Sequence, residues 1–364
     1  MTTEPVRLGY IGCGFMAQNV HLPNFATLDD CRLVALAETR PRLGAQVAAR
    51  YGIPTVYGDH RDLAADSTVE AVAVSADFAG QGEIAADLLR AGKHVFMEKP
   101  MAVSVAQAAR ILAAARAGGA RLMVAYMKRY DPGNVLVRDT IRRWREGGEM
   151  GRLLYARNHG FCGNWTADLD TSRMLTTDEP YPPSSATDVL PAWLPADRVK
   201  GYVGYLQQYT HNVNLLRYLL DAGDDVGVRT VDLDADGLTG LVTLDLAGTR
   251  GIIESGSTTF HAWDEHTQVY FERGWIHAWA PPFFVKPAQS RVEIYEGGKH
   301  HSYTYPIVEP QTAWPYREEA ASFVRALRTG EPFRSSGEDT ATDVRLFEDI
   351  YRRHLGMVRH HEEG

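Results

Sequence analysis

A glycine-rich turn near the N-terminus constrains this sequence more than any other feature. The apolar run from Val6 to Ile11 leads directly into Gly12-Cys13-Gly14-Phe15-Met16-Ala17, after which a helix can begin. Between a strand and a helix, the first glycine permits the tight turn, the second lets the backbone approach a pyrophosphate, and the alanine lets the helix pack close to the strand. The helix N-terminus adds free amides and a positive dipole end. The pattern predicts a dinucleotide-binding unit with these cofactor contacts: Gly12, Cys13, Gly14, Phe15 and Met16.

An acidic residue follows the second expected strand. That strand covers residues 32–37 and ends at Glu38, about 20 residues after the glycine turn, where a carboxylate can bind the adenosine ribose hydroxyls. Such a carboxylate would repel a 2′-phosphate, so we expect NAD rather than NADP. Arg40 keeps NADP as the alternative, because its guanidinium could pair with a 2′-phosphate. We expect Glu38, Thr39 and Arg40 to border the adenosine end of the cofactor.

Strands and helices then alternate through the first third of the chain, as in a doubly wound parallel sheet. We expect helices at 41–51, after Asp59 and at 82–91, and strands at 55–57, 71–74, 94–97 and 121–126. Ligands of such sheets bind at the carboxyl ends of the strands. The cofactor crevice should therefore include these further residues: Ser75, Ala76, Asp77, Gln81, Glu98 and Lys99.

The pattern changes after Pro132, where strands follow one another with glycine-containing turns between them. We expect strands at 152–159, 228–236, 238–245, 250–257, 267–271 and 291–295, and helices at 201–220, 316–327 and 340–354. Hairpin turns indicate a mostly antiparallel sheet, and with no helix between its strands one face should stay open. The expected fold class is α/β with α+β. A Rossmann domain with a doubly wound parallel sheet covers residues 1–128, and a substrate-binding and oligomerisation domain with an open-faced sheet covers residues 129–364.

Length and composition exclude several classes of protein. The 364 residues are enough for two hydrophobic cores, and 45% hydrophobic with 23% charged residues is typical of globular chains. The net charge of -8 argues against a nucleic-acid partner. No segment reads as a membrane span or a secretory signal, so we expect a cytoplasmic protein with no membrane partner. We expect no metal, because the three cysteines are scattered, His300 and His301 would point to opposite faces of a strand, and residues 360–361 lie in a polar tail.

Four motifs together carry a family resemblance. The glycine turn, His21-Leu22-Pro23, Glu98-Lys99-Pro100 and Lys128-Arg129-Tyr130-Asp131-Pro132 resemble the glucose-fructose oxidoreductase and inositol dehydrogenase (Gfo/Idh/MocA) family. The resemblance covers essentially the whole chain and is strongest over the first 135 residues. It implies a sugar-like substrate, a homodimer or homotetramer built on the open sheet face, and a lysine, here Lys99, that reaches the reacting oxygen. Two positions depart from the family, since Asp77 and Gln81 stand where similar proteins often have Pro and His.

The helix expected at 201–220 carries the second catalytic candidate. Gln207 and His211 are four residues apart, so both side chains should project from one helical face. In the resembled family this helix usually carries Asp and then His, with the His as proton acceptor, so the resemblance implies that His211 is the base and that Gln207 replaces its supporting carboxylate. An amide can orient the ring but stabilises an imidazolium less, by about a tenfold effect or more. Arg129, Trp165 and Asn212 are the expected substrate contacts.

The stretch from about 163 to 198 is expected to be irregular and to influence substrate choice. Between Asp168 and Asp188 it is acidic, with Asp168, Asp170, Asp178, Glu179 and Asp188 against one arginine, Arg173. A solvated surface explains such a run. If the stretch folds over the active site, it favours an amine-bearing sugar, such as an aminoglycoside intermediate of antibiotic biosynthesis.

The sequence thus predicts an NAD-dependent dehydrogenase that oxidises a secondary hydroxyl of a sugar, cyclitol or aminosugar to a ketone, or that runs the reverse reduction. Two alternatives stay open. The first is a glycosidase that uses NAD transiently for oxidation, elimination and re-reduction. The second is a non-catalytic, cofactor-binding regulator, which the replacement of the usual aspartate by Gln207 favours. Reduction of an imine or a linear tetrapyrrole is less favoured, because Lys99 and His211 are both present.

Overall fold

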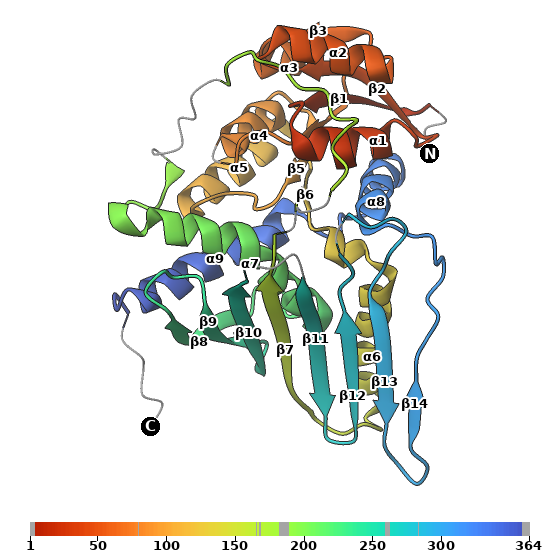
Figure 1. Cartoon of the computed structure of the whole chain (residues 1–364), viewed down its shortest axis with the longest axis vertical. Helices are drawn as coiled ribbons and strands as arrows, with labels where there is room; N and C mark the ends of the chain where they lie inside the picture. Colours follow the sequence, from red (N-terminus) through yellow and green to blue (C-terminus); the bar gives the residue numbers. More distant parts are fainter. Residues whose placement is uncertain are drawn as a thin grey trace. The chain divides into compact units, whose positions relative to one another are not determined.

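The computed structural model describes residues 4–78, 80–164, 166, 169–181, 189–258, 263–282 and 284–358 (Figure 1). Trp165, Asp168, Asp188, His360 and His361 lie outside these residues. The chain forms two compact units. Unit 1 comprises Met1–Tyr126, Asp170–Ala192 and Tyr316–Val344, and unit 2 comprises Met127–Leu169, Trp193–Pro315 and Arg345–Gly364. Within the described part of the chain, no helix is long and apolar enough to cross a membrane.

These units are not two contiguous stretches of chain. The first change of unit, between Tyr126 and Met127, lies beside the expected boundary at residue 128. Residues 170–192 and 316–344 then return to unit 1, and helix α9 (Gly337–His354) runs from one unit into the other. Whether the domains of this protein follow a single boundary at residue 128 stays a prediction.

Unit 1 is a parallel sheet flanked by helices. Its strand order is β3-β2-β1-β4-β5-β6, the order of a dinucleotide-binding Rossmann fold. The strands are β1 (Val6–Ile11), β2 (Cys31–Ala37), β3 (Thr55–Tyr57), β4 (Ala71–Val74), β5 (His94–Glu98) and β6 (Leu122–Ala125). The helices are η1 (Ala17–His21), α1 (Leu22–Phe25), α2 (Pro41–Tyr51), α3 (His60–Ala65), α4 (Gln81–Arg90), α5 (Val105–Gly118) and α8 (Pro315–Thr329).

Local sequence explains these elements well. Every residue of β4 and of β6 is buried, as expected for strands covered on both faces. The side chains of Asp59 and Ser104 accept hydrogen bonds from backbone amides in the first turns of α3 and α5, which fixes where these helices begin. Together with the strand order and parallel pairing of unit 1, these features confirm the predicted doubly wound parallel sheet.

Unit 2 is built on a mostly antiparallel sheet of eight strands in the order β14-β13-β12-β11-β7-β10-β9-β8. They are β7 (Leu153–Cys162), β8 (Val226–Leu233), β9 (Gly240–Leu246), β10 (Thr249–Ser257), β11 (Asp264–Phe271), β12 (Gly274–Trp279), β13 (Arg291–Glu296) and β14 (Ser302–Thr304). The helices of this unit are η2 (Met127–Tyr130), α6 (Pro132–Gly147), η4 (Ala196–Arg198) and α7 (Val199–Leu220). Among the described strand pairs of this sheet, only β7 and β10 are parallel, so the predicted mostly antiparallel sheet is confirmed.

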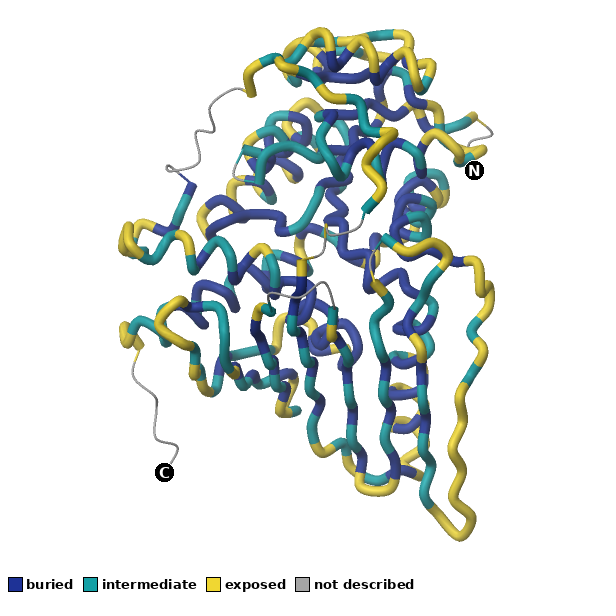
Figure 2. Tube along the Cα trace, viewed as in Figure 1, coloured by how far each residue is buried: buried dark blue, intermediate teal, exposed yellow. Residues whose placement is uncertain are grey.

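The two faces of this sheet differ in burial. Buried and half-buried residues alternate along β7, β11 and β12 (Figure 2). Helices α6 and α7 contact the sheet at β12, β13, β7 and β10. The half-buried face carries stacked aromatic rings, among them Tyr155 on Tyr270 and Trp275 on Tyr295. This is the open face that the strand pattern predicted.

Candidate cofactor-binding and active site

Residues expected to contact the cofactor lie at one edge of the sheet in unit 1. Gly12, Glu38, Ser75 and Lys99 directly follow or end strands β1, β2, β4 and β5, which all run in the same direction. The amide of Gly12 donates to the carbonyl of Ala37 (2.9 Å), so the glycine turn lies beside the end of β2. The carboxyl edge therefore gathers these residues, as the position rule for parallel sheets predicts.

The two glycines of the turn have different structural roles. Gly12 adopts φ +92°, and a Cβ atom there would lie 2.4 Å from the carbonyl oxygen of Ser75. A side chain at this position is therefore excluded by the fold itself. An added Cβ on Gly14 would meet no atom within 4 Å. The open space at Gly14, beside the start of a helix, fits the close approach of a pyrophosphate.

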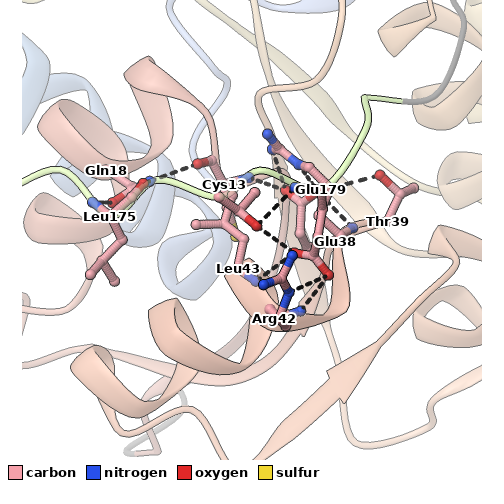
Figure 3. Close-up of polar contacts among 10 residues, drawn as sticks. Cys13, Gln18, Glu38, Thr39, Arg42, Leu43, Leu175 and Glu179 are labelled. Atoms are coloured by element: carbon pink, nitrogen blue, oxygen red, sulfur yellow. Dashed lines mark hydrogen bonds and ion pairs between the residues drawn. The ribbon is translucent and has the colours of Figure 1, made fainter.

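Glu38 joins the end of β2 to the glycine turn. Its carboxylate accepts a hydrogen bond from the amide of Cys13 (2.8 Å) and is clamped by Arg40 through Nε (2.7 Å) and one terminal nitrogen (3.0 Å) (Figure 3). Thr39 Oγ1 adds a longer hydrogen bond of 3.3 Å. Burial alone would raise the pKa of Glu38, but the hydrogen bonds and charge of Arg40, with the Cys13 amide, hold that pKa below its ordinary value. The carboxylate is thus ionised at neutral pH and placed where a ribose hydroxyl would need an acceptor.

The Glu38–Arg40 ion pair changes the choice between NAD and NADP. Its members are only 3% and 15% exposed, so the two charges largely cancel within the pair. A 2′-phosphate would have to draw Arg40 away from Glu38 before it gained that cation. The pair would not exert the unscreened repulsion of an isolated carboxylate, and the preference for NAD over NADP stays a prediction.

The Glu98-Lys99-Pro100 turn is held by a side chain from the neighbouring helix. Gln81 Nε2 donates to the carbonyl oxygens of Glu98 (3.0 Å) and Pro100 (3.1 Å). It therefore bridges the two neighbours of Lys99, the residue that we expect to contact the reacting oxygen. Glu98 accepts from the backbone amide of Lys99 (3.1 Å), and its carboxylate is hydrogen-bonded to Nε2 of His21 (2.7 Å). Gln81 therefore supports the lysine loop, and its expected contact with the cofactor stays a prediction.

The loop after β4 is also organised by hydrogen bonds within unit 1. Ser75 Oγ lies 2.7 Å from the hydroxyl of Tyr10. Asp77 accepts from the amide of Gly80 through its side chain (3.3 Å), and its carbonyl accepts from the amide of Gln81 (2.8 Å), which starts α4. Ala76 packs against the core of unit 1. These residues shape the edge at which the cofactor is expected.

A buried polar cluster in unit 2 was not predicted as a group. Lys128, in η2, forms an ion pair with Glu265 of β11. Asn212 of α7 donates to Asn158 of β7 and, at 3.4 Å, to the same Glu265. The indole of Trp263 donates to Glu265 as well (3.1 Å). Asn212, expected as a substrate contact, is thus part of a network whose partners lie 53 and more residues away along the chain, which no local pattern reveals.

Arg129 is buried and directly follows Lys128 of this cluster in the sequence. Its Nε donates to Asn214 (2.7 Å), and its guanidinium lies over the ring of Tyr218 at 5.4 Å from the centroid. Both partners belong to α7, so Arg129 ties η2 to that helix. Its expected role as a substrate contact stays a prediction.

The two candidates on α7 differ in exposure. His211 is 8% exposed, whereas Gln207, one turn earlier, is exposed. The spacing of four residues places them on adjacent turns of α7, and the expected shared face stays a prediction. The catalytic roles of His211, Gln207 and Lys99 stay predictions.

The acidic stretch contributes to unit 1 in a way that the sequence did not suggest. Asp178 forms an ion pair with Arg42, and the carboxylate of Glu179 accepts from the backbone amides of Arg42 (3.0 Å) and Leu43 (3.2 Å). These acids are therefore engaged with α2, and they give no support to the argument for an amine-bearing substrate.

Comparison with known proteins agrees with this fold. Residues 6–126 match the family described as "Oxidoreductase family, NAD-binding Rossmann fold". Myo-inositol 2-dehydrogenase of Thermotoga maritima is 24% identical over 92% of this chain and 92% of its own length. Inositol 2-dehydrogenase of Burkholderia lata is 30% identical, over 57% of this chain and 59% of its own length.

A solved structure shows the same two-part fold. The 3-ketoreductase KijD10 from Actinomadura kijaniata, in complex with NADP and TDP-benzene, superimposes with a TM-score of 0.69 over 96% of this chain and 97% of its own, at 22% identity. This likeness shows that the whole chain has the same fold. The expected resemblance is borne out: residues 6–126 match the NAD-binding Rossmann domain of the Gfo/Idh/MocA oxidoreductase family, and a relative named as an inositol dehydrogenase matches over 92% of the chain.

Proposed function

We propose that this protein is an NAD-dependent dehydrogenase that oxidises a secondary hydroxyl of a sugar or cyclitol, and that also runs the reverse reduction. The observation that carries the proposal is the edge of unit 1, where open space at Gly14, the ionised Glu38 and the braced Lys99 loop lie at the ends of parallel strands. The curated relatives named as inositol dehydrogenases support the substrate class.

Each proposed role follows from the chemistry of the residue. Gly12 and Gly14 hold the pyrophosphate, and Glu38 binds the ribose hydroxyls. Bound NAD supplies a hydride acceptor. Lys99 donates a hydrogen bond to the reacting oxygen and stabilises negative charge on it, and Gln81 fixes the loop that carries this lysine. His211 takes the hydroxyl proton, and Gln207 stands where a supporting carboxylate is usual, so we expect a weaker base than an Asp–His pair would give.

The assay is reduction of NAD, followed by absorbance at about 340 nm, with a panel of inositols, other cyclitols, aldoses and aminoglycosides. Lys99→Ala and His211→Ala should each lower the rate by roughly 10²- to 10⁴-fold, the usual contribution of a positioned acid or base. Lys200→Ala and His300→Ala are the matched controls, since both residues are exposed. Binding of NAD without oxidation of any panel member, and without release of a sugar from glycosides, would instead support a regulator.

An oligomer on the open sheet face is proposed as well. The face of unit 2 that carries Tyr155, Tyr270, Trp275 and Tyr295 is half-buried and aromatic, which is typical of surfaces that pair with another copy. We propose a homodimer or a homotetramer. Its size would be measured by light scattering after gel filtration.

A further inference from the structure

Residues 170–181, here called the strap, cross the helices at the cofactor edge of unit 1. Gln18 exchanges two hydrogen bonds with the backbone of Leu175, of 2.9 and 2.8 Å, and also donates to the carbonyl of Cys13 in the glycine turn (2.8 Å) (Figure 3). Arg50, near the end of α2, donates to the carbonyl of Arg173 (2.7 Å). The strap is therefore fastened to both the glycine turn and α2.

The strap caps the N-terminus of α2. The residue before this helix, Arg40, makes no side-chain cap. Glu179 supplies one from a distance of 136 residues or more along the chain, because its two carboxylate oxygens accept from the amides of Arg42 and Leu43. Thr177 Oγ1 donates to the same carboxylate (2.8 Å) and holds it in place. An anion-binding helix terminus is thus already filled by an anion of the chain itself.

The N-terminus of α2 lies where the 2′-phosphate of NADP would need hydrogen-bond donors. Helix α2 begins at Pro41, directly after the Glu38–Arg40 pair, which the proposed function places beside the adenosine ribose. A 2′-phosphate at the end of β2 requires cations or amide donors nearby. Arg40 pairs with Glu38, and Arg42 pairs with Asp178. The first amides of α2 already donate to Glu179. The ring of Tyr181 lies over Arg40 at 4.9 Å and keeps that side chain against the strap.

We propose that Glu179 is a specificity-determining residue that makes the site reject NADP, because it occupies the α2 amides and adds a second carboxylate at the start of the helix that follows Glu38. The inference rests on the proposed function, in which unit 1 binds NAD. NAD loses nothing by this arrangement, since its 2′-hydroxyl needs only the acceptor that Glu38 provides. Discrimination then arises from repulsion and from blocked donors as well as from the ribose contact.

The test compares the dissociation constants of NADH and NADPH, measured by the change in nicotinamide fluorescence on binding, for the full chain and for Glu179→Gln and Glu179→Ala. We expect NADPH to bind roughly 5- to 30-fold more tightly to both variants, as release of a helix terminus for an anion allows, while the constant for NADH changes less than about threefold. Asp170→Ala is the matched control, because Asp170 is an exposed acid of the strap that accepts only from Ser172 in the described contacts.

Each outcome decides between distinct readings. A wild-type protein that binds both dinucleotides equally, or a Glu179→Gln variant with unchanged affinity for NADPH, overturns the inference and leaves the dehydrogenase proposal intact. Equal tightening of both dinucleotides shows that the strap acts by obstruction and not by charge, which also overturns it. Failure of the wild-type protein to bind either dinucleotide refutes the proposed function itself. Far-UV circular dichroism of both variants checks that a loosened α2 cap has not unfolded unit 1, and Glu179→Gln keeps an acceptor for one amide.

Discussion

Glu319 offers a sharp test of the electrostatics of unit 1. This residue of α8 is 0% exposed, and neither carboxylate oxygen has a hydrogen-bond partner among the described residues. Burial raises the pKa of its carboxyl well above the ordinary value of 4.5, and the negative charge of Glu98 raises it further. The folded protein therefore retains the proton of this carboxyl at pH values at which the unfolded chain has already released it.

The sign and size of the consequence follow from linkage. Above pH 4.5 the unfolded chain releases a proton that the folded protein retains, so the free energy of unfolding falls as pH rises, by about 1.4 kcal/mol per pH unit until the raised pKa is reached. Between pH 4.5 and pH 7 this amounts to at most about 3.4 kcal/mol. Glu319→Met has a similar volume and cannot ionise, so it should be more stable than the wild-type protein, by a margin that grows as the pH rises above about 4.5.

The measurement is denaturant unfolding of both proteins at several pH values, followed by circular dichroism. Glu318→Met, which removes a neighbouring acid of α8 that is only half-buried, is the matched control. A margin for Glu319→Met that is constant with pH would refute the argument, since it would mean that the carboxyl has the same protonation in the folded and unfolded states.

Three further predictions address the cofactor edge and the open sheet. Gly12→Ala should destabilise the protein by about 1–3 kcal/mol in thermal unfolding, because at φ +92° a Cβ cannot fit beside the carbonyl of Ser75. Gly14→Ala should keep the thermal stability of the wild-type protein and bind NADH more weakly. Equal behaviour of the two variants would contradict the assignment of roles. Gln81→Met should lower kcat without changing the NADH dissociation constant, because it frees the lysine loop; a change confined to NADH affinity would instead make Gln81 a direct cofactor contact. Trp275→Arg should shift the mass measured by light scattering toward the monomer, and an unchanged mass would exclude this face as the interface.

Much of unit 1 could be predicted from the sequence because its signals are local. The predicted bounds of β1, α2, β3 and β4 match the structure. Strand β12 and helix α6 were missed, although both carry local signals. Asp131 caps α6 through the amides of Gly133 and Asn134, and the two residues between β11 and β12 form a tight hairpin turn. Strand β14 is exposed at all three residues, so it has no buried face that a pattern could reveal.

The candidate site was predictable only where a motif defines it. The positions of Gly12, Glu38 and Lys99 follow from patterns within a few residues of a strand end. Contacts between distant parts of the chain do not, because Glu179 accepts from Arg42, and Glu265 pairs with Lys128, across more than a hundred residues. From the sequence alone, an acidic residue in an irregular stretch is expected on a solvated surface, because only the fold shows which backbone amides it caps.

The late return of residues 316–344 to unit 1 bears on how the protein is made. Phe323 of α8 packs on Phe25 and Phe96, with ring centroids 6.5 and 5.5 Å apart, and Ser335 exchanges hydrogen bonds of 2.9 and 2.6 Å with Val124 at β6. These contacts cannot form until almost the whole chain has left the ribosome. The nucleotide-binding unit, although it begins at the N-terminus, must wait for the last part of the chain to complete its core. Folding during synthesis therefore cannot finish this unit first, and a fragment that ends near residue 128 would expose the apolar surface that α8 covers.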